Sequence, residues 1–159
     1  MNVTASTLVD TVDLLHESVY LALQIDKIRL LLPQTQCIAM ASADNLQPNR
    51  DDSQRSVGQI VRGQQVWLIY ALTTNLELTQ DPPGTRTHCV LLSSDRHQIG
   101  LLCDQAFPIE RNELIVGPIP ECMYTSELLY AGFALYQDQI AFISTTDVLH
   151  KQLHGLKQN

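Results

Sequence analysis

Short apolar runs separated by turn residues dominate the pattern along this chain. Residues 19–24 and 28–32 are two such runs, and Asp26-Lys27 between them suits a tight turn. Two later pairs of runs repeat this arrangement, at 89–92 with 99–103 and at 128–135 with 140–144. Each pair is predicted to form a β-hairpin, and the last is predicted to turn at Gln137-Asp138.

A fourth hairpin is predicted around one Arg-Gly step in the middle of the chain. Arg62 and Gly63 divide a short apolar run that ends at Val61 from a longer one that begins at Val66. Gly63 supplies the backbone freedom that a tight turn needs. Arg62 places a permanent cation with five hydrogen-bond donors beside that turn. Arg62 either pairs with a surface carboxylate or contacts a partner, and the residues alone favour neither.

Two short helices are predicted in the first part of the chain. In the N-terminal extension, residues 1–18, apolar residues recur at helical spacing between acidic ones. This helix either docks on its own domain or faces a partner. Pro33 ends a strand and also suits the first position of a helix. We therefore expect a second helix over 34–41, whose apolar side would carry Cys37, Ile38 and Ala41.

Turn and cap residues divide the remainder of the chain. The break at 81–84, Asp-Pro-Pro-Gly, is predicted to separate lobe one, residues 19–80, from lobe two, residues 81–146. A closing helix over 147–154 is predicted, with Thr145 or Thr146 as its cap. Its buried stripe would be Leu149, Leu153 and Leu156. Several short strands and few helices favour small β-barrels or a sandwich.

Composition and charge narrow the classes of function. The chain has 159 residues, a formal charge of −7 and a pI near 5.0. Its arginines are scattered singly, which argues against nucleic acid or an anionic membrane as a partner. No apolar run reaches the roughly 18 residues of a membrane-spanning helix, so direct membrane insertion is not expected. The four cysteines lack metal-ligand spacing, and the three that lie in apolar runs, Cys37, Cys89 and Cys103, are interpreted as small buried hydrophobes in a reducing, cytoplasmic compartment.

No group of residues makes a convincing catalytic, cofactor or metal site, so the chain is predicted not to be an enzyme and to need no cofactor. His150 and His154 share a helix face, but a metal site needs a third ligand. Ser94, Asp95 and His97 lie together, and a hydrophilic hairpin tip accounts for them better than a catalytic triad does. These two clusters carry the alternative hypothesis of an enzyme.

Four motifs follow one another along the chain: the opening hairpin with Pro33 and a short helix, the run from Gly58 to Val66, the segment from Gly100 to Asp104, and the closing hairpin with the helix after it. In this order they resemble the CheW-like domain family, the coupling proteins and matching kinase domains of bacterial chemosensory arrays. The likeness spans about residues 19–153. The chain is identified as a divergent single-domain member, because Trp67, Tyr70 and Thr145 replace the residues usual in the family.

The resemblance implies a mainly β fold of two packed, SH3-like, five-stranded β-barrel lobes with a few short helices. It also implies a non-catalytic adaptor, a scaffold for chemotaxis signal transduction that couples chemoreceptors to a CheA-type histidine kinase. The expected partners are the regulatory domain of that kinase and the signalling tip of a methyl-accepting chemoreceptor. The protein would be cytoplasmic and recruited to membrane receptor arrays. Divergent members of this kind occur beside systems that control type IV pili and twitching motility.

The resemblance also places six partner-binding residues on this chain by position. They are Ile38 and Ala41 of the predicted helix, Arg62 and Gly63 of the central turn, and Asp104 and Phe107 of the second lobe. An alternative is a CheW-like barrel remodelled to bind an unrelated protein or to self-associate through its strand edges. Trp67, the only tryptophan, is expected in the core, with a partner contact as the alternative.

Overall fold

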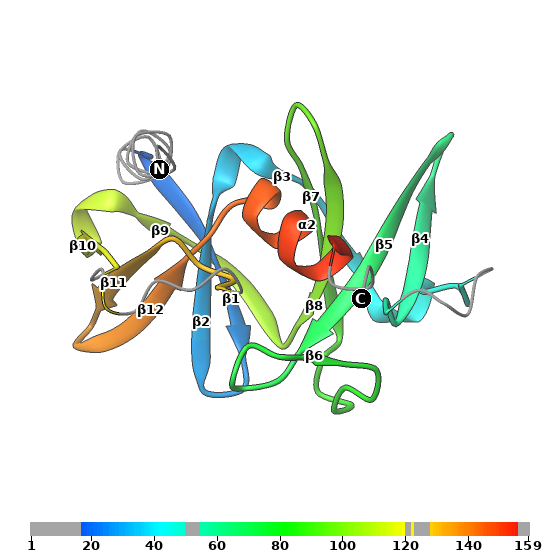
Figure 1. The fold of residues 1–159 in the computed structure, drawn as a ribbon, viewed down its shortest axis with the longest axis horizontal. Helices are drawn as coiled ribbons and strands as arrows, with labels where there is room; N and C mark the ends of the chain where they lie inside the picture. Colours follow the sequence, from blue (N-terminus) through cyan, green and yellow to red (C-terminus); the bar gives the residue numbers. More distant parts are fainter. Residues whose placement is uncertain (1–16, 50–54, 120–121, 123–127, 156–159) are drawn as a thin grey trace.

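The structure is a computed structural model that describes residues 17–49, 55–119, 122 and 128–155. The predicted N-terminal helix lies outside these residues. Two six-stranded sheets make up the fold (Figure 1). Sheet A has the order β10-β11-β12-β2-β1-β9, and sheet B has the order β3-β7-β8-β5-β4 with β6 paired to β5. The mainly β, two-lobe fold is confirmed, with six strands in each sheet where five were expected.

The strands of sheet A are β1 (Val19–Ile25), β2 (Ile28–Pro33), β9 (Gln105–Glu110), β10 (Ile115–Pro118), β11 (Gly132–Tyr136) and β12 (Gln139–Ile143). Those of sheet B are β3 (Cys37–Ser42), β4 (Gly58–Arg62), β5 (Gln65–Leu72), β6 (Leu78–Thr79), β7 (His88–Ser93) and β8 (Gln98–Cys103). The helical pieces are α2 (Thr146–Gly155) and the one-turn 3₁₀ segments η1 (Gln34–Gln36), η2 (Ala43–Asn45) and η3 (Arg111–Glu113). None of the helices in the described part of the chain has the length and apolar character needed to span a bilayer.

The buried apolar residues form three clusters. One lies within sheet A and contains Tyr20, Ala22 and Leu31, and another lies within sheet B around Trp67 and Ile69. The third, which we call the shared core, takes side chains from both sheets and from α2. Figure 1 shows α2 in front of the junction between the two sheets.

The shared core explains why several strands read as unbroken apolar runs. Alternate side chains of a strand point to opposite faces of the sheet. In β1, Tyr20 and Ala22 enter the core of sheet A, whereas Leu21 and Leu23 enter the shared core. Strands buried on both faces need apolar residues at every position. An unbroken apolar run along a strand such as β1 therefore indicates that both faces of the strand are buried.

The expected division into lobes at residue 80 does not describe the sheets. Sheet B is one continuous stretch of chain from β3 to β8, and the break at 81–84 is a loop inside it. Sheet A is assembled from both ends of the described chain, because β1 pairs with β9 and β2 pairs with β12. Local turn chemistry reveals where a chain bends, but it carries no information about which distant strand pairs next.

The helix predicted over 34–41 is wrong beyond its first turn. Only η1 is helical, and β3 then pairs antiparallel with β7. Along β3, Ile38, Met40 and Ser42 are exposed and the residues between them are half-buried, which is the period of a strand. Without β3, the outer edge of β7 would leave backbone groups unpaired. Pairing with β7 therefore makes this segment a strand, although the spacing of its apolar residues also fits a helix.

The four predicted hairpins are present. They turn through left-handed backbone at Asp26 (φ 54°), Gly63 (φ 62°) and Gln137-Asp138 (φ 51° and 65°), and through the polar segment between β7 and β8. The closing helix is also present as α2. Thr145 Oγ1 accepts the backbone N–H of Val148 at 3.1 Å, so Thr145 is its cap.

The buried stripe of α2 is confirmed at Leu149 and Leu153, and Leu156 lies outside the described residues. Strands β9 and β10 were not predicted from the sequence.

Candidate functional site

The six residues expected to bind partners do not line one groove. Ile38 lies in a groove between the two sheets, and Ala41 and Arg62 lie in a second groove on sheet B. Gly63 forms the exposed β4–β5 turn beside Arg62. Asp104 and Phe107 take part in separate contacts within the fold. The structure therefore separates the set into two surfaces and two internal contacts.

The first surface, the inter-sheet groove, runs between the start of β3, the β7–β8 turn and the start of α2. Ile38 lines it and is 53% exposed. Its other apolar lining comes from Pro33, Ala131 and Val148, and polar side chains of the β7–β8 turn form the opposite wall. A groove with a few apolar anchors and a polar rim suits a protein segment better than a small ligand.

The second surface, the edge groove, lies between β3 and β4. Met40, Ala41, Val61 and Arg62 line it, and Met40 is 46% exposed. The ion pairs found among the described residues involve Arg86 and His97 rather than Arg62. The pairing of Arg62 with a surface carboxylate, which the sequence left open, is therefore absent from the described residues. Arg62 presents its charge to solvent beside apolar side chains.

A third surface was not predicted. On β10, β11 and β12, Ile115, Leu135 and Ile140 form one cross-strand row of exposed apolar side chains, and Phe133 lies in the next row. Ile115 is 72% exposed and Ile140 is 62% exposed. We call this surface the outer face. The exposed residues of this face alternate along the strands with Val116, Ala134 and Ala141, which point into the core of sheet A. Once β10 is known to be a strand, this alternation shows which of its residues belong to the outer face.

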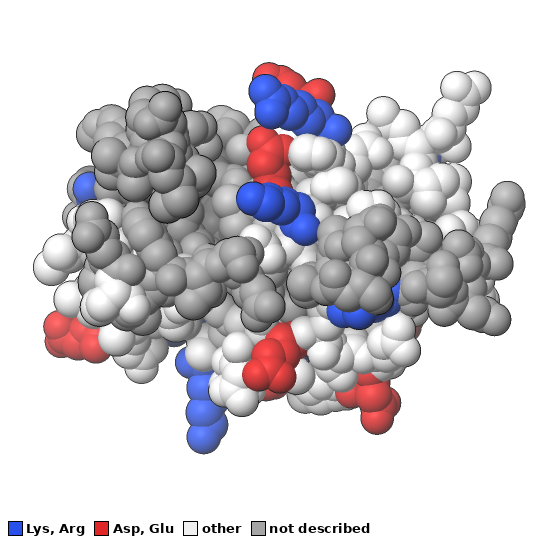
Figure 2. Space-filling model, in the orientation of Figure 1, with Lys and Arg blue, Asp and Glu red and all other residues white. Residues whose placement is uncertain are grey.

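Charged side chains are scattered on the face of the molecule that Figure 2 presents. Figure 2 shows acidic and basic side chains scattered singly or in small groups on the face in view, without a large patch of one sign. This agrees with the scattered arginines of the sequence. Apolar exposure, rather than charge, is therefore what distinguishes the outer face and the two grooves from the rest of the described surface.

Asp104 belongs to an ion-pair network around Arg86, which is 3% exposed. Arg86 donates from Nη1 to the carbonyl of Leu72 at 2.7 Å and from Nη2 to Asp26 Oδ2 at 3.0 Å. Arg86 Nε lies 3.1 Å from Asp104 Oδ1, without the geometry of a hydrogen bond. The network ties the β1–β2 turn of sheet A to β5 of sheet B, so Asp104 has a structural role.

The carboxylate of Asp26 is held in its charged form by this network. Hydrogen bonding from Thr74 Oγ1, at 2.7 Å, is the main reason that the pKa of Asp26 is lowered, and the Arg86 charge adds to the effect. Asp104 Oδ2 also accepts the backbone N–H of Asp26 at 2.8 Å. The sequence offered no signal for Arg86 beyond a single basic residue near a predicted loop.

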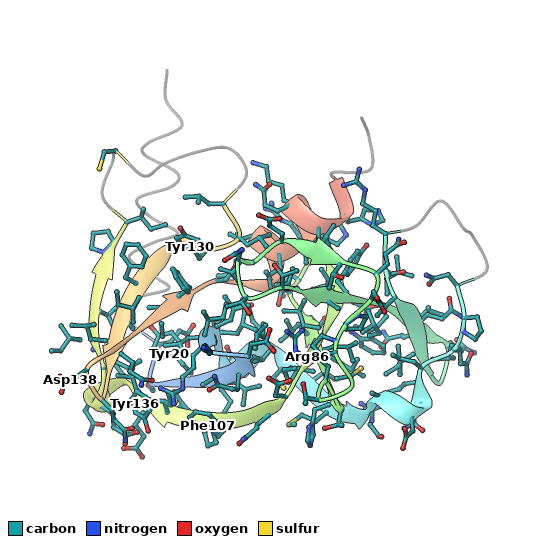
Figure 3. The ribbon with its side chains drawn as sticks, turned by 90° about the horizontal axis from the view of Figure 1, so that it is seen from below. Tyr20, Arg86, Phe107, Tyr130, Tyr136 and Asp138 are labelled. Atoms are coloured by element: carbon teal, nitrogen blue, oxygen red, sulfur yellow. The ribbon has the colours of Figure 1, made fainter. Side chains whose placement is uncertain are left out.

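Phe107 is occupied by contacts within sheet A. The Arg29 guanidinium lies 5.7 Å from the centre of its ring and 5.3 Å from the centre of the Tyr136 ring. Figure 3 shows Phe107 and Tyr136 toward one end of the molecule, with Arg86 nearer its middle. The cation comes from the same sheet and lies to one side of the two rings, whose centres are 6.5 Å apart, so Phe107 is a packing residue.

The Ser94, Asp95 and His97 cluster does not have the geometry of a nucleophile with its base. Ser94 Oγ donates to Asp147 Oδ1 at 2.6 Å, and His97 Nδ1 lies 2.8 Å from the same oxygen. A triad requires the serine to bond the imidazole instead. Ser94 Oγ also accepts the backbone N–H of His97 at 3.1 Å, so the hydroxyl stabilises the turn. The sequence did not pair Asp147 with this turn.

The histidines and cysteines do not form a metal site in the described residues, where no group of three or more His, Cys, Asp or Glu side chains is placed to hold an ion. Cys37, Cys89, Cys103 and Cys122 are free thiols. Burial raises the pKa of Cys89 and of Cys103 to about 12, so these two thiols stay protonated and unreactive near neutral pH.

The residues that depart from the family pattern are accommodated inside the fold. Trp67 is 2% exposed, and its indole N–H donates to the carbonyl of Leu92 at 3.2 Å. Tyr70 belongs to the shared core, and Thr145 caps α2. Trp67 is therefore a core residue, as expected. Neither aromatic residue reaches the surface as a contact for a new partner.

No protein-family model matches the chain, and no curated protein matches it by sequence. Among solved structures, the fold is similar to that of the scaffolding protein TtCheW from Thermoanaerobacter tengcongensis. The two share 12% sequence identity with a TM-score of 0.62, over 80% of this chain and 88% of that one. The chain has a CheW-like fold. At this level of identity the similarity concerns the fold alone. In this structure the inter-sheet groove lies at the junction of the two sheets.

Proposed function

We propose that this protein is a non-catalytic adaptor of a bacterial chemosensory complex, which couples chemoreceptor signalling tips to a CheA-type histidine kinase. The observation that carries the proposal is the presence of separate exposed apolar surfaces on the two sheets of a CheW-like fold. An adaptor must hold two partners at once, and surfaces on different sheets allow this without a steric conflict. The solved scaffolding protein with the same fold supports the class of function.

Each surface is assigned one partner. The inter-sheet groove is the proposed site for the receptor tip, with Ile38 as its apolar anchor. The outer face is the proposed site for the regulatory domain of the kinase, with Ile115 and Ile140 as anchors. The edge groove with Arg62 lies on the same sheet as Ile38 and would fix the register of a bound helix through charge. Individually modest contacts suffice when a lattice links many adaptors.

The first test is a pull-down from the native cell lysate with the captured proteins identified by mass spectrometry. The unaltered protein is expected to recover a chemoreceptor and a histidine kinase. Ile38→Asp is expected to lose about tenfold or more of the receptor while it keeps the kinase, and Ile140→Asp is expected to do the reverse, because a charge buried in an apolar contact is costly. Each variant is thus the control for the other.

A second pair of variants tests the charge of the edge groove. Arg62→Glu is expected to reduce receptor recovery, whereas Lys27→Glu makes the same change of charge at the β1–β2 turn and should leave recovery intact. Recovery of neither partner by the unaltered protein would contradict the adaptor function and leave only the fold.

We further propose a cytoplasmic location at receptor arrays and an output through type IV pili. Loss of twitching motility in a strain that carries Ile38→Asp is the test of that output.

A further inference from the structure

Three histidine rings form a stacked ladder between the β7–β8 turn and α2. His97, in the turn, stacks on His150 with ring centres 4.0 Å apart and an interplanar angle of 19°. His150 stacks on His154, one helical turn further along, with ring centres 4.8 Å apart and an angle of 24°. We call these residues the histidine ladder. The proposed adaptor function makes no use of them.

Both ends of the ladder are anchored. At one end, His97 Nδ1 lies 2.8 Å from Asp147 Oδ1. At the other end, His154 Nδ1 lies 3.4 Å from the hydroxyl of Tyr70 on β5. The ladder therefore follows the polar side of α2, while Leu149 and Leu153 on its apolar side are buried in the shared core. Helix α2 is held by this stack of rings, by its apolar contact with the shared core, and at its first turn by Gln36, whose Oε1 accepts the backbone N–H and the hydroxyl of Thr146 at 2.8 and 2.9 Å.

The ionisable groups around the ladder supply little compensating negative charge. Asp147 of α2 contacts His97, and it is shared with the hydroxyl of Ser94 and lies near Arg96. The β7–β8 turn contributes Asp95 and Arg96 to the same pocket, whose charges oppose each other, and β5 contributes the neutral Tyr70. One carboxylate can stabilise one imidazolium, but a second proton on the ladder would place like charges in contact.

We propose that the histidine ladder is an acid-sensitive latch, which holds α2 against the β7–β8 turn when at most one ring is charged and releases it when further protons bind. Stacked neutral rings attract one another. Two adjacent imidazolium rings repel, and the helix is the element free to move because the turn belongs to a sheet. The proposal goes beyond the adaptor function and does not depend on it.

The pKa is lowered both for His150, at the centre of the ladder, and for Asp147, which anchors one end of it. Burial, followed by the charges of His97 and His154, lowers the pKa of His150 below its usual value. Desolvation opposes the ionisation of Asp147, but hydrogen bonds from Ser94 and His97 outweigh it and the pKa of Asp147 is lowered. At these two groups the folded state binds fewer protons than the unfolded chain, so the contribution of His150 to stability is lost as the pH falls below about 6.5, and that of Asp147 is lost only in more acidic solution, below about 4.

The latch is next to the inter-sheet groove. The β7–β8 turn residues Ser94 and Arg96 line that groove on one side, and Asp147 and Val148 of α2 line it on another. Movement of α2 away from the turn would separate these two walls. Acidification would therefore alter the shape of the groove as well as the stability of the helix.

The test is hydrogen exchange of the α2 amides at pH 7.5 and pH 5.5 in EDTA, corrected for intrinsic rates and compared with the amides of β8. In the unaltered protein, protection of α2 relative to β8 is expected to fall severalfold on acidification. His150→Phe keeps a stacked ring that cannot be charged, so its protection should change little. His88→Gln removes an exposed histidine outside the ladder and should behave like the unaltered protein.

Equal relative protection of α2 at both pH values in the unaltered protein would overturn the proposal. An equal fall in His150→Phe would overturn it too. Because that variant could lose the helix altogether, NMR titration of the histidine rings in the unaltered protein provides a second measurement. His150 is expected to titrate below the value for an unfolded chain, and titration at or above that value would contradict the latch.

Discussion

At the scale of single residues, Arg86 is the side chain whose role differs most from what its type and position suggest. It is a basic residue in a loop, yet it is almost fully buried and reaches three groups from both sheets. Guanidinium is suited to this position because its planar fork can serve several acceptors at once. The cost of burying its charge is offset by two carboxylates that keep partial access to water.

Replacing Arg86 with Met should lower the free energy of unfolding by about 2–3 kcal/mol, because the Leu72 carbonyl loses its donor and two carboxylates lose their counter-charge. Urea denaturation measures this loss. Arg62→Met is the matched control, since Arg62 is exposed, and its effect should stay within about 0.5 kcal/mol. Equal effects of the two substitutions would show that the network contributes nothing.

At the scale of elements, the parallel contact between β5 and β8 depends on a glycine. Gly100 is opposite Ile69 in the register, and a Cβ added to it would lie 2.2 Å from Ile69 Cδ1 and 3.4 Å from Leu91 Cδ2. Ile69 is fully buried, so its methyl group has no free space into which to move. The glycine is required by the close approach of side chains in the core of sheet B.

Gly100→Ala is therefore expected to destabilise the protein by about 1–3 kcal/mol through overpacking. Ile69→Val removes the methyl group that the new Cβ would meet, so the double variant should be more stable than the sum of the single effects by about 1 kcal/mol. Urea denaturation of all three variants gives this coupling. Gly84→Ala, where the added Cβ has nothing within 4 Å, is the control and should be nearly neutral. Additive effects would contradict the steric account.

At the scale of the whole molecule, the shared core makes the two sheets one unit. Leu23 and Leu30 of sheet A, Leu92 and Leu101 of sheet B, and Leu149 of α2 all belong to it. Neither sheet can lose its structure without exposing the apolar face of the other. Two lobes with separate cores would not have this property.

A single cooperative unfolding transition is the expected consequence. Far-UV circular dichroism reports on both sheets, whereas the fluorescence of Trp67 reports on the core of sheet B. The two signals should give the same urea midpoint, and Leu23→Ala in the shared core should lower both midpoints together. A circular dichroism transition in two steps, with only one accompanied by a change in fluorescence, would indicate that the sheets unfold separately.

The sequence predicted those parts of the fold that local chemistry determines. Hairpin turns were found because Asp26, Gly63 and Asp138 are residue types suited to the left-handed backbone that these turns adopt. Strand β3 was mistaken for a helix because its apolar residues also fit helical spacing, and only pairing with β7 decides between them. The lobe boundary failed for a related reason, since pairing of β1 with β9 depends on contacts between distant segments.

The binding role of the six predicted residues stays a prediction, and the structure shows where they lie. Ile38 and Arg62 are on exposed grooves, but Asp104 and Phe107 were assigned by position in a family pattern and turn out to have partners within the fold. The outer face was missed because β10 was not predicted, although Leu135 and Ile140 were within a predicted hairpin. Exposure of an apolar residue is not visible in a sequence until the neighbouring strand is known.

The interleaved assembly of sheet A has a consequence for the protein during its synthesis. Strands β1 and β2 leave the ribosome before the other strands, but β9, which pairs with β1, begins about seventy residues after β2 ends, a delay of roughly 4–14 s at bacterial or eukaryotic rates of elongation. Throughout that interval the face of the hairpin that packs into the core of sheet A lacks the strands that complete that core. The nascent chain is thus a natural client for chaperones that bind exposed hydrophobic segments at the ribosomal exit.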